Sequence, residues 1–227
     1  MGQDHTHRQF DTDIERLRSA VTVMGGLVER QVTRAVDAVR LRDMGVAAQV
    51  LADEQRVNQL HLECDLRCNQ TIARRQPIAI DLREIIAVLH INNDLERIGD
   101  ESKKIARKAR ALQGRPRPIP TDRIARMADI AREMLRLAVD AFIRQDPRAA
   151  AALANRDDEV DRLRNELIEE LTTVMGTTPQ SVSAALELVF VVQSIERVGD
   201  HATNISEYVV SVVDGTDTRH SRTAAIG

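Results

Sequence analysis

Glu96-Arg97-Ile98-Gly99-Asp100 returns almost unchanged as Glu196-Arg197-Val198-Gly199-Asp200, 100 residues later in the chain. Each pentad lies in a stretch with the apolar periodicity of a long helix, where residues four apart share one face. The two acidic residues of each pentad are therefore stacked, and like charges at this spacing repel by roughly 0.2–0.5 kcal/mol on an exposed helix. A cation between them removes that cost. Each pentad thus predicts a long helix with a positive charge beside it.

Apolar residues at helical spacing predict six long helices separated by Gly, Pro and Asp signals. The first is expected to begin at the capping box Thr12–Glu15 and to end near Arg42, with Gly25-Gly26 weakening or bending it. The remaining helices are expected from about Val46 to Arg74, from Asp81 to about Leu112, from Thr121 or Asp122 onward, from Asp146-Pro147 to Gly176, and from Thr178-Pro179 to Asp214-Gly215.

The two halves of the chain also match one another outside the pentads. Ala35–Ala38 corresponds to Ala138–Ala141, and Val57 corresponds to Val160, in both cases 103 residues apart. Such self-similarity is typical of a duplicated unit. We therefore predict an all-α fold built as a tandem duplication of a three-helix antiparallel bundle, with six long helices. The expected domains are residues 10–113 and 121–215, joined by a stiff Pro-rich linker at 114–120 and followed by a disordered tail at 216–227.

Composition argues against several classes of function. The net charge is −3 and aromatic residues make up only 2%, so the chain offers nucleic acid neither a basic field nor stacking surfaces. Two cysteines suit a reducing compartment, no signal peptide is visible, and no apolar run approaches the roughly 20 residues of a transmembrane helix. A cytoplasmic protein is expected, and peripheral contact with a membrane stays open.

A second acidic pair stands on the preceding helix of each half, as Glu54-x-x-x-Asn58 and Asp157-x-x-x-Asp161. If neighbouring helices pack together, four oxygen-bearing side chains meet in each half. Oxygen ligands suit hard cations such as Mg²⁺, Mn²⁺ or Fe³⁺, and adjacent carboxylates can bridge several ions. The glycine inside each pentad permits close approach of a helix or an ion. The predicted metal ligands are Glu54, Asn58, Glu96, Asp100, Asp157, Asp161, Glu196 and Asp200.

Other readings of these residues stay open. Arg97 and Arg197 offer structural salt bridges to the same carboxylates, in which case the chain is a helical scaffold. His61, Cys64 and Cys68 form a stripe on one helix face, but no further Cys or His motif completes a metal set, so burial is the favoured interpretation. His90 is likewise expected in the core. His201 follows Asp200 directly and is a candidate ligand or supporting residue.

No catalytic motif accompanies these acids. The sequence has no Glu-x-x-His of di-iron carboxylate bundles, no Gly-rich phosphate loop and no Gly-x-Ser-x-Gly. We therefore expect a protein that is not an enzyme. The alternative is a metal-dependent enzyme that uses carboxylate-bridged clusters, for which His201 is the one plausible acid or base.

Further motifs around the two pentads indicate a protein family. Asn93–Asp100, Ala73–Pro77 with Asp81–Arg83, and Gly199–Ile205 together resemble the PhoU family. The resemblance implies two three-helix bundles related by a pseudo-twofold axis, frequently paired as a homodimer, with multinuclear metal clusters on paired Glu/Asp-x-x-x-Asp motifs. It also implies a cytoplasmic negative regulator of phosphate transport and phosphate-starvation signalling. Its implied partners are the ATPase subunit of the phosphate ABC importer and the phosphate-sensing histidine kinase.

Carried onto this chain, the resemblance makes the second half the fuller site. Asp157, Asp161, Glu196 and Asp200 are all acidic there, whereas the first half has Asn58 at one of the four positions. An amide binds cations less strongly than a carboxylate, so a weaker or smaller first site is expected. The metal itself stays open among Fe, Zn, Mn and Mg, in divalent or trivalent form.

Overall fold

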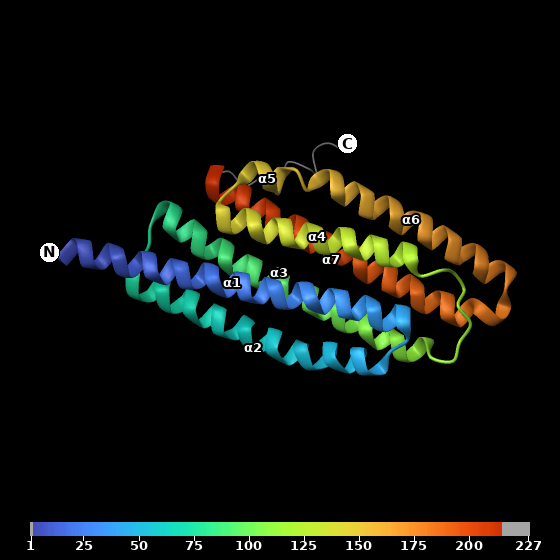
Figure 1. Ribbon diagram of the computed structural model, residues 1–227. Helices are drawn as coiled ribbons and strands as arrows, with labels where there is room; N and C mark the ends of the chain where they lie inside the picture. Colours follow the sequence, from blue (N-terminus) through green and yellow to red (C-terminus); the bar gives the residue numbers. More distant parts are fainter. Residues whose placement is uncertain (1, 215–227) are drawn as a thin grey trace.

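The structure, a computed structural model, describes residues 2–214 and is helical throughout its regular elements. Six long helices and one short one confirm the all-α prediction (Figure 1). Their bounds are α1 Gly2–Leu41, α2 Met44–Arg75, α3 Ala79–Leu112, α4 Asp122–Arg144, α5 Pro147–Ala151, α6 Ala154–Thr177 and α7 Val182–Asp214, with a 3₁₀ turn at Pro179–Ser181. The tail predicted at 216–227 lies outside the described residues.

The first helix differs from its prediction at its start. The prediction of a capping box at Thr12–Glu15 is wrong, because α1 already begins at Gly2 and these residues lie inside it. Tertiary contacts hold this segment: Arg75 Nε donates to Asp13 Oδ2 at 3.0 Å, and Phe10 packs on the core. The glycine pair does not interrupt α1 either. A Cβ at Gly25 would lie 3.2 Å from Val139 of α4, so this glycine permits close helix packing.

The fifth predicted helix is wrong as a single element, because it is broken between α5 and α6. Asp146 caps α5 as expected, accepting from the amides of Arg148 and Ala149. The break at Ala152-Leu153 falls within a run of good helix formers, so local propensity does not explain it. Ala150 and Leu153 are both 1% exposed. Burial of these two side chains against the core overrides propensity here.

Four helices form the centre of the molecule and two flank it (Figure 1). α3 packs antiparallel to α7, as the contacts Asp94–His201 and Lys108–Glu187 require. α1 packs antiparallel to α4, where Arg132 Nη1 lies 2.9 Å from Glu29 Oε1. α2 covers α1 and α3, and α6 covers α4 and α7. The first half is therefore related to the second by an approximate twofold axis between these pairs.

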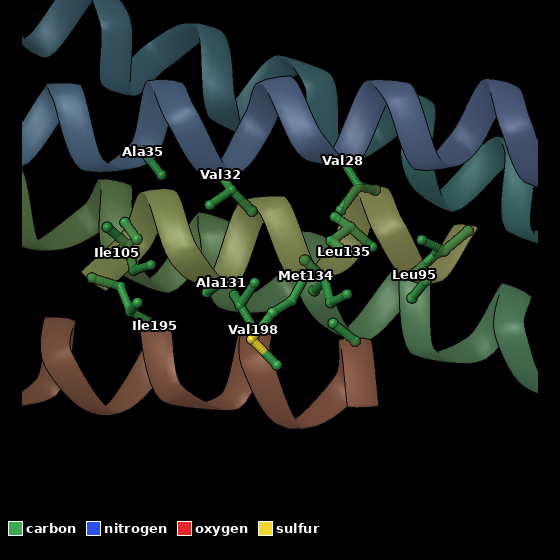
Figure 2. Packing of buried hydrophobic residues seen from close by; sticks show 14 of the residues in the cluster. Val28, Val32, Ala35, Leu95, Ile105, Ala131, Met134, Leu135, Ile195 and Val198 are labelled. Atoms are coloured by element: carbon green, nitrogen blue, oxygen red, sulfur yellow. The ribbon is translucent and has the colours of Figure 1, made fainter. Parts of the chain in front are cut away.

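The buried apolar side chains of both halves form one cluster. Figure 2 shows its middle, where residues of α1, α3, α4 and α7 meet: Val28, Val32, Ala35, Leu95, Ile105, Ala131, Met134, Leu135, Ile195 and Val198. A core this continuous resists relative motion of the halves, because interiors are close-packed.

The segment between α3 and α4 is non-helical, as its prolines predict. It is held to both halves: Arg42 donates to the carbonyl of Arg115, Arg115 bonds Ser183, and Ile119 is 4% exposed. Within the described residues, no helix is both long enough and apolar enough to cross a bilayer.

Candidate functional site

The pentads lie on helices that pack against the helices of the second acidic pair. α2 packs on α3 in the first half, and α6 packs on α7 in the second. A Cβ at Gly99 would lie 3.2 Å from Val57 Cγ1, and one at Gly199 would lie 3.5 Å from Val160 Cγ1. The two valines are equivalent positions of the repeat. The pentad glycine therefore faces the same valine in both halves, with a tight approach at Gly99 and an ordinary contact at Gly199.

In the first half, a lysine side chain occupies the place between the acids. Lys103 Nζ lies 2.8 Å from Glu54 Oε1 and 2.7 Å from Asp100 Oδ1. Burial alone raises the pKa of Asp100, but the hydrogen bonds and charge of Lys103 outweigh it and the net pKa is lowered. The pKa of Lys103 is raised by the same two carboxylates against its own desolvation. The cation that the first pentad predicts is thus supplied by the chain itself.

Two amides complete this first set. Gln31 of α1 is fully buried, and its Nε2 donates to the carbonyl of Val50 at 3.1 Å and to Glu54 Oε2 at 3.4 Å. Asn58 Nδ2 lies 3.4 Å from Glu54 Oε1. Glu96 stands apart from the set, 3.7 Å from Arg97 on its own helix. Glu54, at 5% exposure, is therefore a buried carboxylate that accepts hydrogen bonds from Lys103, Gln31 and Asn58.

In the second half, a threonine replaces that lysine and all four predicted positions are acidic. Thr203 Oγ1 donates to Asp157 Oδ1 at 3.2 Å, and Arg164 Nη1 lies 3.2 Å from Glu196 Oε1. Asp161 and Asp200 lie at the solvent-open edge of the set.

Burial and neighbouring acids together raise the pKa values of Glu196 and Asp200 in the second set. The pKa of Glu196 is raised first by burial and then by Asp200 and Asp161, and Arg164 opposes this only in part. The pKa of Asp200 is raised by burial and then by Asp157 and Asp161. The four acids are therefore within electrostatic range of one another, and ionising all of them at neutral pH costs free energy. A bound cation would remove that cost.

The two sets differ in how well they suit a metal ion. Across residues 2–214, no three His, Cys, Asp or Glu side chains are already arranged to chelate one. The second set nevertheless has four acidic side chains and no lysine among them, which is the chemistry that hard cations prefer. The first set does not fit, because the ammonium of Lys103 fills the position between Glu54 and Asp100.

Lys103, Gln31 and Arg164 were missing from the sequence prediction. A helical-face argument from Asp100 selects Lys104, four residues on, but Lys104 instead binds Glu101 at 2.7 Å. The spacing of three between Asp100 and Lys103 is an equally good signal for an ion pair. Gln31 carries no such signal, because it comes from another helix.

The histidine and arginine beside the second pentad connect the two halves. His201 Nδ1 lies 2.7 Å from Asp94 Oδ1 of α3, and Asn204 Nδ2 lies 3.4 Å from the same oxygen. Arg197 reaches Glu101 of α3 at 3.6 Å. His201 thus serves the α3–α7 contact. Neither Arg197 nor Arg97, both more than half exposed, makes the close structural salt bridge considered from the sequence.

The remaining candidates from the sequence are packing residues. Cys64 and Cys68 are free thiols at 2% and 0% exposure, as predicted. His61 lies 3.6 Å from Asp65 Oδ2 rather than completing a metal set with them. His90 is partly buried and stacks on Tyr208 with ring centroids 4.8 Å apart.

Both halves match one known family. The family model described as the PhoU domain matches the chain twice, over residues 21–109 and 124–209. The chain belongs to the PhoU family. Its curated relatives include the phosphate-specific transport system accessory protein PhoU homologs of Pseudomonas putida, 43% identical over 95% of this chain and 85% of the relative, and of Pseudomonas aeruginosa, 41% identical over 95% and 90%.

Solved PhoU structures have the same fold. The crystal structure of PhoU from Pseudomonas aeruginosa matches with a TM-score of 0.87 at 40% identity, over 91% of this chain and all of that chain. The phosphate transport system regulatory protein PhoU from Streptococcus pneumoniae matches in fold, with a TM-score of 0.85 at 24% identity over 91% and 98% of the two chains. The duplicated three-helix fold predicted from the pentads is confirmed.

Proposed function

We propose that this chain is a cytoplasmic accessory protein that represses phosphate transport and phosphate-starvation signalling without catalysing a reaction. The match to PhoU-named transport accessory proteins along 95% of the chain carries this proposal. Its partners in this proposal are the ATPase subunit of the phosphate ABC importer and the phosphate-sensing histidine kinase. A homodimer is the proposed form of the protein.

The second acidic set is the part of the proposal that concerns metal. Asp157, Asp161, Glu196 and Asp200 would hold one or more ions of Fe, Zn, Mn or Mg. The bound ion would supply positive charge that lets all four carboxylates stay ionised in the folded state. Arg164 already neutralises part of Glu196, and Thr203 orients Asp157. These contacts favour an adaptor surface whose charge depends on metal occupancy.

The regulatory role is tested by deleting the gene and by complementing the deletion strain with the wild-type gene or with variants. Deletion should derepress phosphate-regulated genes in phosphate-replete medium, and the wild-type gene should restore repression. Glu196→Ala/Asp200→Ala should lose copurification with the ATPase subunit or the kinase. Glu96→Ala/Asp100→Ala removes the equivalent acids of the first half and is the matched control, expected to retain copurification if it folds. Unchanged gene expression after deletion would remove the proposal.

The metal is tested separately by elemental analysis of tag-free protein purified without chelator. Metal should be present in the wild type and absent from Glu196→Ala/Asp200→Ala. Protein that contains none, and that gains no thermal stability from added Mn²⁺, Fe, Zn²⁺ or Mg²⁺, would leave the helical-scaffold interpretation in place.

The enzyme alternative is weaker for this chain. The acid or base it needs is His201, whose Nδ1 lies 2.7 Å from Asp94 Oδ1 at the α3–α7 contact, and no catalytic sequence motif accompanies it. Hydrolysis of phosphoesters, or oxygen consumption, by the metal-loaded protein would restore that alternative.

A further inference from the structure

A cleft of about 400 Å³ lies between α1 and α2, far along both helices from the acidic sets. Its walls come from one face of each helix: Asp13, Arg16 and Leu17 on α1, and Arg67, Gln70, Thr71 and Arg74 on α2. The volume falls in the range of pockets that hold small organic molecules, roughly 300–1,000 Å³. Three of its seven lining residues are arginines.

The arginines of this cleft have little else to bind. Arg74 has no ion-pair partner among the described residues. Arg67 lies 3.9 Å from Glu63, at the long limit of an ion pair, whereas Arg16 bonds Asp13 at 3.4 Å. Uncommitted guanidinium groups beside a cleft attract anions, since their charge is not neutralised within the fold.

The one carboxylate in the cleft is already neutralised. Asp13 Oδ2 binds both Nε and Nη2 of Arg75 at 3.0 Å, from outside the cleft lining. Gln70 adds an exposed amide between the arginines, whereas the Thr71 hydroxyl already donates to the carbonyl of Arg67 at 2.9 Å. The cleft therefore offers a positively charged wall with one additional amide donor.

The residues that line this cleft are not repeated at the equivalent positions of the second half. The positions equivalent to Arg67 and Arg74 are Glu170 and Thr177, and Glu170 binds Arg123 at 2.9 Å. The α1 side of the cleft also has no equivalent, because α4 begins at Asp122, which corresponds to residue 19 of α1. In Figure 1, α1 extends beyond the other helices at this end. The cleft is thus an addition to the repeated unit and not part of its packing.

We propose that this cleft binds a small molecule with two or more phosphoryl groups, such as a nucleoside polyphosphate or an inorganic oligophosphate. Arginine pairs with phosphate oxygens through bidentate, charge-assisted hydrogen bonds. Arg67 and Arg74 are seven residues apart on α2, which separates their Cα atoms by about 10 Å. A chain of phosphoryl groups can contact both ends of this row, whereas a single phosphate contacts one. The proposal does not depend on the metal site or on the regulatory role.

The test is isothermal titration calorimetry of the full chain with excess EDTA, so that no metal bridges the anion to the acidic set. The probes are sodium tripolyphosphate, ATP and inorganic phosphate, and flotation with phosphatidylglycerol vesicles tests a lipid surface instead. The variant is Arg67→Gln/Arg74→Gln. The matched control, Arg126→Gln/Arg162→Gln, removes the same charge from exposed arginines of the second half.

We expect one saturable site for tripolyphosphate, ATP or both, tighter than for inorganic phosphate and weakened by added salt. Affinity should fall at least about tenfold in Arg67→Gln/Arg74→Gln and stay unchanged in the control. The arginines concerned are exposed, so both variants should unfold at the wild-type temperature. Absence of saturable binding, equal weakening in the control, equal affinity for inorganic phosphate, or binding confined to vesicles would each overturn the proposal.

Discussion

The two carboxylate sets occupy equivalent places in the duplicated fold and differ in the source of their positive charge. In the first, Lys103 lies between Glu54 and Asp100 at 2.7–2.8 Å. In the second, Thr203 takes that position and a fourth acid, Asp161, replaces the amide. The geometry of the helices was kept after duplication, while the charge balance diverged. A repeated motif therefore does not guarantee a repeated chemistry.

The divergence in the first half is coordinated over three helices. Gln31, Asn58 and Lys103 stand where the second half has Met134, Asp161 and Thr203. Gln31 and Lys103 donate hydrogen bonds to Glu54, and Asn58 lies within 3.5 Å of it. Together they turn a set of acids into a neutralised, hydrogen-bonded cluster that needs no external ion. In the second set no lysine lies between the acids, so their negative charges repel one another.

The largest change in metal binding and stability is expected when residues of the second set replace their equivalents in the first set. Asn58→Asp/Lys103→Thr should give three neighbouring carboxylates, at positions 54, 58 and 100, with Glu96 apart from them and no lysine between them. We expect this variant to gain a metal site and to be strongly destabilised when no metal is bound. At a thousandfold excess of metal over its dissociation constant, binding should restore about 4 kcal/mol. Elemental analysis and urea unfolding with and without Mn²⁺ measure both effects. No increase in bound metal over wild type would show that charge alone does not determine occupancy.

A smaller loss of stability is expected when only the ammonium group of Lys103 is removed. Lys103→Met should lower the free energy of unfolding by about 3 kcal/mol, because Glu54, 6% exposed, is left without its main partner. The equivalent change in the second half, Thr203→Val, removes one neutral hydrogen-bond donor and should cost about 1 kcal/mol. Urea unfolding in EDTA compares the two. Equal losses would mean that Lys103 contributes packing rather than charge.

The pH dependence of the two aspartates should have opposite signs in EDTA. Asp100 has a lowered pKa, so its stabilisation is present at pH 7 and is lost as the pH falls below the unfolded value of 3.8. Asp200 has a raised pKa, so its ionised form opposes folding at pH 7. Asp100→Asn should therefore destabilise by about 1 kcal/mol and Asp200→Asn should stabilise by about 0.5 kcal/mol.

As the pH falls, the effect of Asp200→Asn should disappear first, once the raised pKa of Asp200 is passed, and that of Asp100→Asn should disappear only below the lowered pKa of Asp100. Thermal unfolding across the pH range measures them. A destabilised Asp200→Asn at pH 7 in EDTA would contradict the repulsion inferred for the second set.

Much of the fold follows from local sequence signals. Asp146 caps α5 as predicted, and Pro77 and the prolines of 114–120 separate helices where expected. Asp43 caps α2, which begins at Met44 and so slightly before the predicted start near Val46. The early start of α1 and the break before α6 do not follow, because both depend on what the segment packs against. Leu153 is buried against other helices, and Asp13 is held by Arg75 of α2.

The candidate site was predictable in its acids and not in its cations. Spacing within one helix places Asp100 near Glu96, and the repeat places Glu54 opposite. Which lysine reaches both Glu54 and Asp100 depends on how α2 crosses α3, and the side chain four residues after Asp100 turned out to bind Glu101 instead. Spacing within one helix cannot predict a contact from a third helix, such as that of Gln31.

The smallest expected difference concerns the two pentad glycines. Alanine stabilises a helix interior relative to glycine by up to about 1 kcal/mol, provided that its Cβ fits. At Gly199 the nearest atom would be Val160 Cγ1 at 3.5 Å, an ordinary contact, so Gly199→Ala should stabilise by about 0.5 kcal/mol. At Gly99 the Cβ would lie 3.2 Å from Val57 and 3.3 Å from Gln31 Oε1, both fully buried. Gly99→Ala should therefore lower the free energy of unfolding by about 0.5 kcal/mol, because the cost of overpacking exceeds the gain in helix propensity. Chemical unfolding of both variants in EDTA measures the difference, and an equally stabilising pair would mean that the first half is no more tightly packed around its pentad than the second.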